Sequence, residues 1–207
     1  NLMQKANFPS TRIQLYTDYE AMDTDSIVAS ALDIVSDESC LRNDMGEVLQ
    51  IRSADETVQK ILYNLFYDVL NIEFNLWSWT RNMLKYGDFY LKLEISEKFG
   101  VYNVVPFSSY TIIRVEGSDP ANPSDVKFKY DPSYSVSENP LGFQQISPAV
   151  GVNTGEEVIF DNYEMAHFRL LTDMNFLPYG RSYIEPARKI FKQYVLMEDA
   201  MLIHRIV

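Results

Sequence analysis

The feature that most constrains this fold is the final stretch of the chain, residues 182–207, which carries the pattern of one long helix. Ser182 followed by Glu185 has the form of a capping box, in which each side chain satisfies a backbone N–H at the helix start. Apolar residues then recur every three or four positions up to Ile206, which predicts a stripe buried against another element. The chain ends on Ile-Val, without a glycine, asparagine or proline. We therefore expect further residues, or another subunit, to complete the packing of an internal stretch of a longer protein.

The overall charge excludes one broad class of function. The chain has 207 residues, with 18 basic against 29 acidic side chains, for a net charge of −11. Such a surface repels a phosphate backbone, so nucleic-acid binding over the whole surface is excluded and any contact with DNA has to be local or weak. The final helix differs, because residues 181–205 carry five basic side chains against three acidic ones, a local balance of +2. By itself this balance is typical of a solvated helix face.

Cysteine usage and hydropathy limit the environment of the chain. Cys40 is the single cysteine, so we expect no internal disulfide framework, a reducing compartment, and a thiol placed in the core. The chain is 46% hydrophobic, which is ample for one sizeable domain. No apolar run reaches the roughly 18 residues of a membrane span, and no basic-then-apolar leader opens the chain. We therefore expect a soluble protein with no stable membrane insertion.

The first part of the chain is predicted to be irregular through residue 16 and then helical. Residues 23–38 predict a helix behind an Asp/Thr cap, with Ile27, Ala31 and Ile34/Val35 on its inward side. The following segment, 41–52, contains a turn signal between short alternating runs. It therefore predicts a β-hairpin.

Two further helices are predicted before the strands begin. Ser53 with Glu56 repeats the capping-box pattern and opens a helix that should end near Asn71. A second helix over 72–86 should end at Gly87. The inward-facing residues of this helical pair are expected to include Ile61, Leu62, Leu65, Phe66, Val69, Leu70, Phe74, Trp77 and Met83.

From Asp88 the apolar period changes to two, which predicts strands, beginning with a hairpin over 88–107. The fold class is therefore α+β. Helical segments and a hairpin come first, a small, mostly antiparallel β-rich unit follows, and a long C-terminal helix runs off the end of the chain. We divide the sequence into an irregular segment 1–18, an α+β domain 19–180 and the start of the long helix, 181–207. Further short strands are expected at 110–115, 126–130, 143–146, 157–160 and 164–171, with surface loops at 117–125 and 131–142.

The sequence offers no motif for catalysis. His167 and His204 lie far apart with no ligand-spaced Cys or His beside them, and both are better interpreted as core or surface histidines. The glycines are scattered singly, so no phosphate-binding loop is present, and no nucleophile elbow is found. Asp23, Asp25 and Glu38 could supply oxygen ligands to Mg²⁺, but they coincide with predicted helix ends, where such residues cap. We expect no enzyme activity, no cofactor and no metal.

The order of the parts resembles a known family. The first predicted helix carries a Tyr19-to-Ile27 run followed by Ala31-Leu-Asp-Ile and Asp37-Glu38, and a helical pair and a β-rich unit come next. A strand with Ala166-His-Phe-Arg169 then leads through Tyr179-Gly-Arg-Ser182 into a helix with Leu196-Met-Glu-Asp-Ala200. In this order the motifs resemble the portal proteins of tailed bacteriophages, most closely those of T-even-like myoviruses.

The resemblance implies a fold and a function. It implies that residues 19–180 form the peripheral wing and that the helix after Arg181 starts the stem, with the rest of the stem, the clip and the crown downstream. It further implies a structural subunit of a ring, typically of about twelve copies, at one capsid vertex of the virion, assembled in the host cytoplasm. Double-stranded DNA would pass without sequence-specific binding during packaging and ejection. The implied partners are the major capsid and scaffold proteins, the terminase large subunit, and neck and head-completion proteins.

The candidate interface or channel residues all lie on the final helix. The basic ones could contact phosphates or pair with acidic residues of a neighbouring subunit, and we favour pairing between subunits because such contacts recur around a closed ring. The alternative function is an α+β scaffold or adaptor of another viral or cellular assembly that does not bind DNA. The candidates are Arg188, Lys189, Lys192, Glu198, Asp199 and Arg205.

Overall fold

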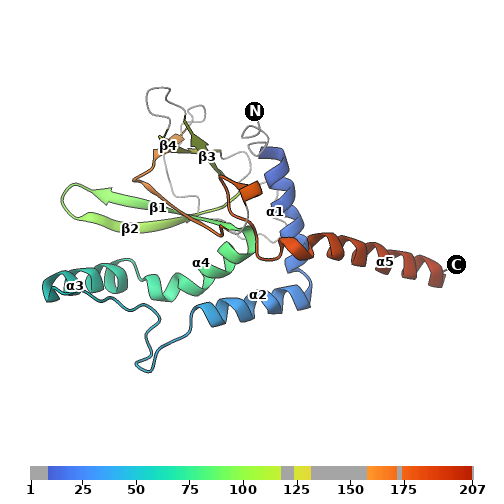
Figure 1. The fold of residues 1–207 in the computed structure, drawn as a ribbon, viewed down its shortest axis with the longest axis horizontal. Helices are drawn as coiled ribbons and strands as arrows, with labels where there is room; N and C mark the ends of the chain where they lie inside the picture. Colours follow the sequence, from blue (N-terminus) through green and yellow to red (C-terminus); the bar gives the residue numbers. More distant parts are fainter. Residues whose placement is uncertain (1–8, 118–123, 132–157, 172–173, 207) are drawn as a thin grey trace.

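A computed structural model describes residues 9–117, 124–131, 158–171 and 174–206 and confirms the α+β class. Figure 1 shows the helices α2, α3 and α4 on one side of the β1–β2 hairpin, with α1 across their end and α5 extending away from the body. The helices are α1 (Pro9–Asp23), α2 (Ser26–Ser39), α3 (Glu56–Tyr63), α4 (Ile72–Tyr86) and α5 (Arg188–Ile206). The strands are β1 (Asp88–Ser96), β2 (Gly100–Phe107), β3 (Ile112–Glu116), β4 (Val126–Tyr130), β5 (Val158–Asp161) and β6 (Met165–Arg169).

Helix α1 corrects the predicted irregular opening. Pro9 stands at the first position of the helix, where a missing N–H costs nothing, so it begins the helix instead of breaking it. Tyr16, Tyr19 and Met22 then lie three residues apart and are all buried in the core. This core also holds Leu32 of α2 and Leu84 of α4, together with Tyr110 and Ile184.

Helix α2 lies where it was predicted, but its inward face was predicted wrongly. Ile27 and Ile34 are 78% and 61% exposed, and Ala31 beside them is also exposed. The other side, with Leu32 and the partly buried Val35, packs into the core instead. The helix is apolar on both sides, so spacing alone could not select the buried one.

Polar contacts with α4 fix the rotation of α2. Arg81 on α4 binds both Asp33 of α2, at 2.5 Å, and Asp23, at 2.8 Å. One turn further on, the indole Nε1 of Trp77 donates a hydrogen bond to Asp37 at 2.7 Å. Charged and polar side chains along this seam thus decide which apolar side of α2 is buried.

The segment 41–52 is a loop and not the predicted β-hairpin. Its turn exists, since the Asn43 side chain accepts the backbone N–H groups of the residues two and four positions on. Its backbone, however, pairs with side chains of the helices, as when Val48 N–H donates to the Glu73 carboxylate at 3.2 Å. Because helix side chains satisfy these groups, no second strand is needed.

The helical pair is confirmed in position but is more exposed than predicted. The N-cap of α3 is Asp55, two residues after the predicted Ser53, and its carboxylate accepts the Thr57 N–H at 2.7 Å. The helix continues as a π-helical turn (Asn64–Val69) before α4, which ends at Gly87 as expected. Ile61 and Phe74, predicted to face inward, are exposed. Cys40 is only half-buried, with its Sγ 3.7 Å from Thr80 Oγ1.

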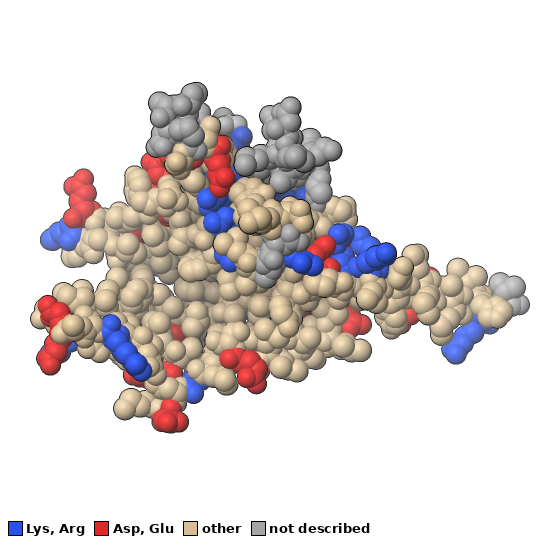
Figure 2. Space-filling view, viewed as in Figure 1, with Lys and Arg blue, Asp and Glu red and all other residues tan. Residues whose placement is uncertain are grey.

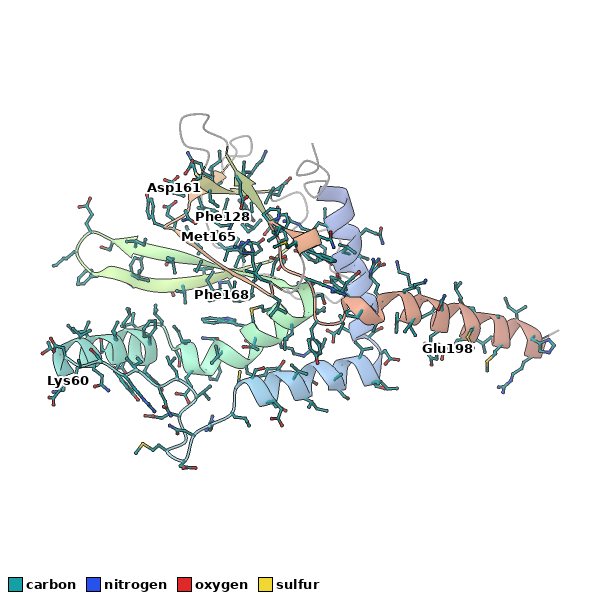
Figure 3. All side chains as sticks on the ribbon, in the orientation of Figure 1. Lys60, Phe128, Asp161, Met165, Phe168 and Glu198 are labelled. Atoms are coloured by element: carbon teal, nitrogen blue, oxygen red, sulfur yellow. The ribbon has the colours of Figure 1, made fainter. Side chains whose placement is uncertain are left out.

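The strands form two small antiparallel sheets, with orders β2-β1-β6 and β3-β4-β5. This confirms the predicted antiparallel β-rich unit; the expected strand 143–146 lies outside the described residues. The sheets meet through a second buried cluster, part of which is labelled in Figure 3. Its members are Tyr90, Phe107, Ile112, Phe128, Phe160 and Met165.

Two glycines join the end of α4 to the segment that leads into α5. A Cβ placed on Gly180 would lie 2.0 Å from the carbonyl oxygen of Gly87, far below van der Waals contact. The same carbonyl accepts the N–H of Leu170 at 3.0 Å, so it cannot move aside without losing a bond. Only glycine therefore allows the two backbones to approach this closely.

We predict that Gly180→Ala lowers the free energy of unfolding by roughly 2–4 kcal/mol, because the new Cβ forces the two backbones apart. Urea denaturation measures the change. Gly46→Ala is the matched control: Gly46 has φ 81° and no atom within 4 Å of an added Cβ, so only the backbone strain of roughly 1–2 kcal/mol is expected. Equal losses in the two variants would show that the close approach is not constrained as described.

Candidate assembly interface

A buried carboxylate anchors the base of α5. Asp88, at the start of β1, has a side chain only 1% exposed. Its Oδ1 accepts the Gly180 N–H and contacts His167 Nε2, both at 2.8 Å, and its Oδ2 accepts the Tyr16 hydroxyl at 3.2 Å. One side chain thus connects β1, β6, α1 and the segment before α5. A buried charge is tolerated only when it is hydrogen-bonded in this way.

His167 lies between Asp88 and a cation. Its Nδ1 is 3.3 Å from a guanidinium nitrogen of Arg114, which can only donate, so the neutral ring accepts there and donates from Nε2 to Asp88. Its ring also stacks on Tyr90, with the centroids 4.3 Å apart. Burial lowers the pKa of His167 below 6.5, although the contact with Asp88 opposes that shift. The predicted interpretation of His167 as a core histidine is confirmed.

A set of charged contacts holds α5 against α1. Arg188 donates to Asp18 at 3.0 Å and to both carboxylate oxygens of Glu185, at 2.9 and 3.0 Å. Lys192, one turn along, contacts the same oxygen of Asp18 at 2.6 Å. The Tyr19 hydroxyl donates to Glu185 at 2.6 Å. We call these five residues the α1–α5 clamp, and together they fix where α5 leaves the body.

The capping box predicted at the start of the long helix is only half right. The Ser182 hydroxyl accepts the Ile184 N–H at 3.2 Å and donates to Leu84 O at 3.3 Å. Glu185 does not complete the box, because its carboxylate is held in the clamp. The chain passes through a 3-10 turn (Glu185–Ala187), and the α-helix starts at Arg188.

Beyond the clamp, α5 has apolar side chains on two opposite sides. At 3.6 residues per turn, Ile190, Tyr194, Met197 and Met201 fall on one side, which we call the outer face. All four are exposed, Ile190 by 69% and Met197 by 62%. In Figure 2 most of the visible surface of α5 is neither acidic nor basic.

The opposite side of α5 forms a groove with α1, which has a volume of about 360 Å³. Its floor is apolar, and the charged clamp residues Asp18, Arg188 and Lys192 stand at its rim. Phe191 is partly buried there against the core of the body. The apolar residues that line the groove are Ala21, Met22, Phe191, Val195 and Leu196.

The predicted interface residues differ in whether their own chain already engages them. Arg188 and Lys192 lie together in the clamp and contact acidic residues of their own chain. Glu198, labelled in Figure 3, lies out along α5, where it accepts a hydrogen bond from Tyr194 of the same helix. Among the described residues, no ion pair engages Lys189, Asp199 or Arg205.

Sequence reasoning missed the acidic partners of this region. Asp18 and Asp88 lie 170 and 92 residues away from the groups they hold in the α5 base, Arg188 and Gly180. Neither carboxylate stands in a motif. The one signal available was Asp88 itself, a charged residue directly before the apolar run Phe89-Tyr-Leu91 at the start of a strand.

Two of the three acidic residues considered for Mg²⁺, Asp23 and Asp25, serve structural roles. Asp23 binds Arg81 and Lys85, and Asp25 caps α2 by accepting the Ile27 N–H at 2.9 Å. Within the described ranges, no group of three or more His, Cys, Asp or Glu is arranged to hold a metal ion. None of the described helices is both long and apolar enough to span a bilayer.

We predict that His167 makes folding sensitive to mild acid. Its folded-state pKa lies below 6.5, so as the pH falls below that value the unfolded chain takes up a proton that the folded chain does not, and stability decreases. His167→Gln should lower stability at pH 7.5 but remove this decrease between pH 7.5 and about 5.5. Urea denaturation at both pH values is the measurement. His204→Gln, at an exposed position, is the control and should keep the wild-type loss of stability in mild acid. If this variant no longer showed that loss, its assignment to His167 would be wrong.

A second prediction concerns the clamp. Burial alone would raise the pKa of Asp18, but hydrogen bonds from Lys192 and Arg188 outweigh it and lower that pKa below 3.8. The stabilisation is therefore complete above pH 3.8 and disappears as the pH falls through the folded-state pKa. Asp18→Asn should cost roughly 1–2 kcal/mol of stability at pH 7, and progressively less as the pH falls below 3.8. Asp161→Asn, in an exposed pair at 4.0 Å, should cost less than about 0.5 kcal/mol. An equal cost in both variants would argue against the clamp.

Comparison with known proteins identifies one matching family. The family model described as Bacteriophage T4-like portal protein (Gp20) matches residues 12–207, from the first turn of α1 through α5. Among curated proteins, no sequence matches the chain. The match covers nearly the whole chain and agrees with the resemblance found in the sequence, so the chain belongs to the bacteriophage T4-like portal protein family.

Proposed function

We propose that this chain is the wing and first stem segment of a ring-shaped portal at one capsid vertex, through which the phage genome is packaged and ejected. The observation that carries the proposal is α5, a helix of 19 residues that leaves the body with exposed apolar side chains on two opposite sides. Apolar side chains on a helix face normally pack against another element. Two opposite apolar faces suit a subunit with an identical neighbour on each side, as in a closed ring.

The charge of the chain suits a conduit. A net charge of −11 weakens adhesion of a phosphate backbone, so DNA can move past the subunit without being held. In the described structure, Arg188 and Lys192 are already engaged by Asp18 and Glu185, which leaves them less able to bind phosphates. These ion pairs count against phosphate contacts by Arg188 and Lys192, although they form within one chain. We keep the preference for pairing between subunits over contacts with DNA as part of the proposal. For pairing between subunits the candidates are Lys189, Glu198, Asp199 and Arg205, together with the N–H donors of Lys192 that Asp18 does not use.

The finer parts of the proposal follow from the family. Residues 19–180 would form the wing and 181–207 the start of the stem, with α1 adding its residues 9–18 to the wing. The partners would be the major capsid and scaffold proteins, the terminase large subunit, the neck and head-completion proteins, and double-stranded DNA. The location would be the virion vertex, after assembly in the host cytoplasm. The role is structural, not enzymatic.

Negative-stain electron microscopy of the full-length protein tests the proposal. We expect rings with a central hole wide enough for duplex DNA, and expect the double variant Ile190→Glu/Met197→Glu to abolish them, because two buried charges would have to be desolvated in each interface. Phe99→Glu, at an exposed position of the β1–β2 turn, is the matched control and should form rings normally. Monomers or closed dimers of the wild-type protein would refute a ring.

A further inference from the structure

The groove between α1 and α5 is a surface that its own chain leaves open. Its apolar lining includes Ala21 of α1 and Val195 and Leu196 of α5, and all three are exposed. The groove is continuous with the core, because Met22 and Phe191 at its base belong to, or pack against, the buried cluster of the body. An apolar partner seated there would therefore extend an existing core.

The charges at the rim of the groove argue against nucleic acid as its occupant. Asp18 lies between Arg188 and Lys192, so the rim is nearly balanced and offers no cluster of unpaired cations for a phosphate backbone. A free apolar segment with an acidic flank fits better, since Lys192 remains half-exposed and uses one of its three N–H donors on Asp18. The occupant should thus be apolar, with a carboxylate beside it.

The outer face of α5 has these properties. Ile190, Tyr194, Met197 and Met201 form an exposed apolar stripe at positions i, i+4, i+7 and i+11, the spacing of a helix face that packs on another element. Glu198 lies at the edge of the stripe, hydrogen-bonded to Tyr194. Because groove and outer face lie on opposite sides of one helix, a copy cannot fill its own groove with its own outer face.

We infer that the outer face of α5 of one copy docks in the α1–α5 groove of the next. This inference rests on the proposed ring and names the contact that builds it. The contact is heterologous, since groove meets outer face and each copy retains one free groove and one free outer face until the ring closes. Glu198 of one copy would then approach the rim cations of the next, which gives the pairing between subunits a specific partner in Lys192.

Neighbouring helices related by rotation about a ring axis run alongside one another with similar heights. The groove spans residues 188–196 of α5, so the residues of the neighbour that enter it should come from the same part of the helix, with Tyr194 near the middle. Ala21 contributes the opposite wall from α1. Ala21 of one copy is therefore expected to meet Ile190, Tyr194 or Met197 of the next.

Disulfide trapping between separately tagged copies tests the contact. In a Cys40→Ser background, full-length protein carrying Ala21→Cys is co-expressed with protein carrying Ile190→Cys, Tyr194→Cys or Met197→Cys. Within residues 1–207 each copy then has one cysteine. Any cysteine elsewhere in the full-length protein is also changed to serine, so a disulfide can only join two copies. We expect at least one of the three pairs to give about tenfold more mixed dimer than the control pair of Ala21→Cys with Phe99→Cys, because docking holds the thiols at high effective concentration.

The outcomes separate this inference from the proposed ring. Mixed dimers in a preparation that shows rings by electron microscopy support both. Rings in which none of the three pairs exceeds the control overturn the groove contact and leave the portal proposal standing. Mixed dimers without rings support the contact and refute the ring. Disulfides between two Met197→Cys copies, in place of mixed dimers, would show outer face meeting outer face and overturn the inference. Absence of both rings and disulfides would refute both.

Discussion

The buried carboxylate of Asp88 is the interaction on which the rest of the structure depends. It accepts hydrogen bonds from a strand, from α1 and from the segment before α5, three parts of the chain that are distant in sequence. A desolvated charge is costly unless each of these donors is present, so the three segments cannot shift independently. The glycine pair beside it brings the same segments into backbone contact. The direction of α5 is therefore decided inside the body, although the helix itself is exposed.

A projecting helix gains from a fixed base. Few tertiary contacts cover α5 beyond its first turns, and a helix without packing is only marginally stable in water. Within the α1–α5 clamp, the contacts of Arg188 with Asp18 and Glu185 stabilise the first turn of α5 and set its crossing with α1. Because that geometry exists before any partner binds, little ordering is left to be done on association. In the proposed ring the body would thus present α5 ready for assembly, and the neighbour packed against the helix would supply its remaining stability.

Sequence periodicity predicted most elements and few of their orientations. The change of period at Asp88 located the strands, and Gly87 correctly ended α4, because both signals are local. The buried side of α2 was not predictable, since Ile27 and Leu32 are equally apolar and only the contacts of Arg81 and Trp77 choose between them. The base of α5 was missed for the same reason: Asp18 and Asp88 act on residues far along the chain, and no spacing pattern records such a pairing.

The distribution of charge and apolar surface decides where copies of this chain can meet. At −11 the bodies repel one another, which opposes association through most of their surfaces. The region of α5 is the exception, with a local balance of +2 and apolar side chains on both sides. The exposed apolar surface, which favours association, and the lowest charge repulsion between copies therefore both lie on α5. Because that element has two opposite apolar faces, contact through one face would leave the other free, so the proposed association would continue until a closed arrangement used every face.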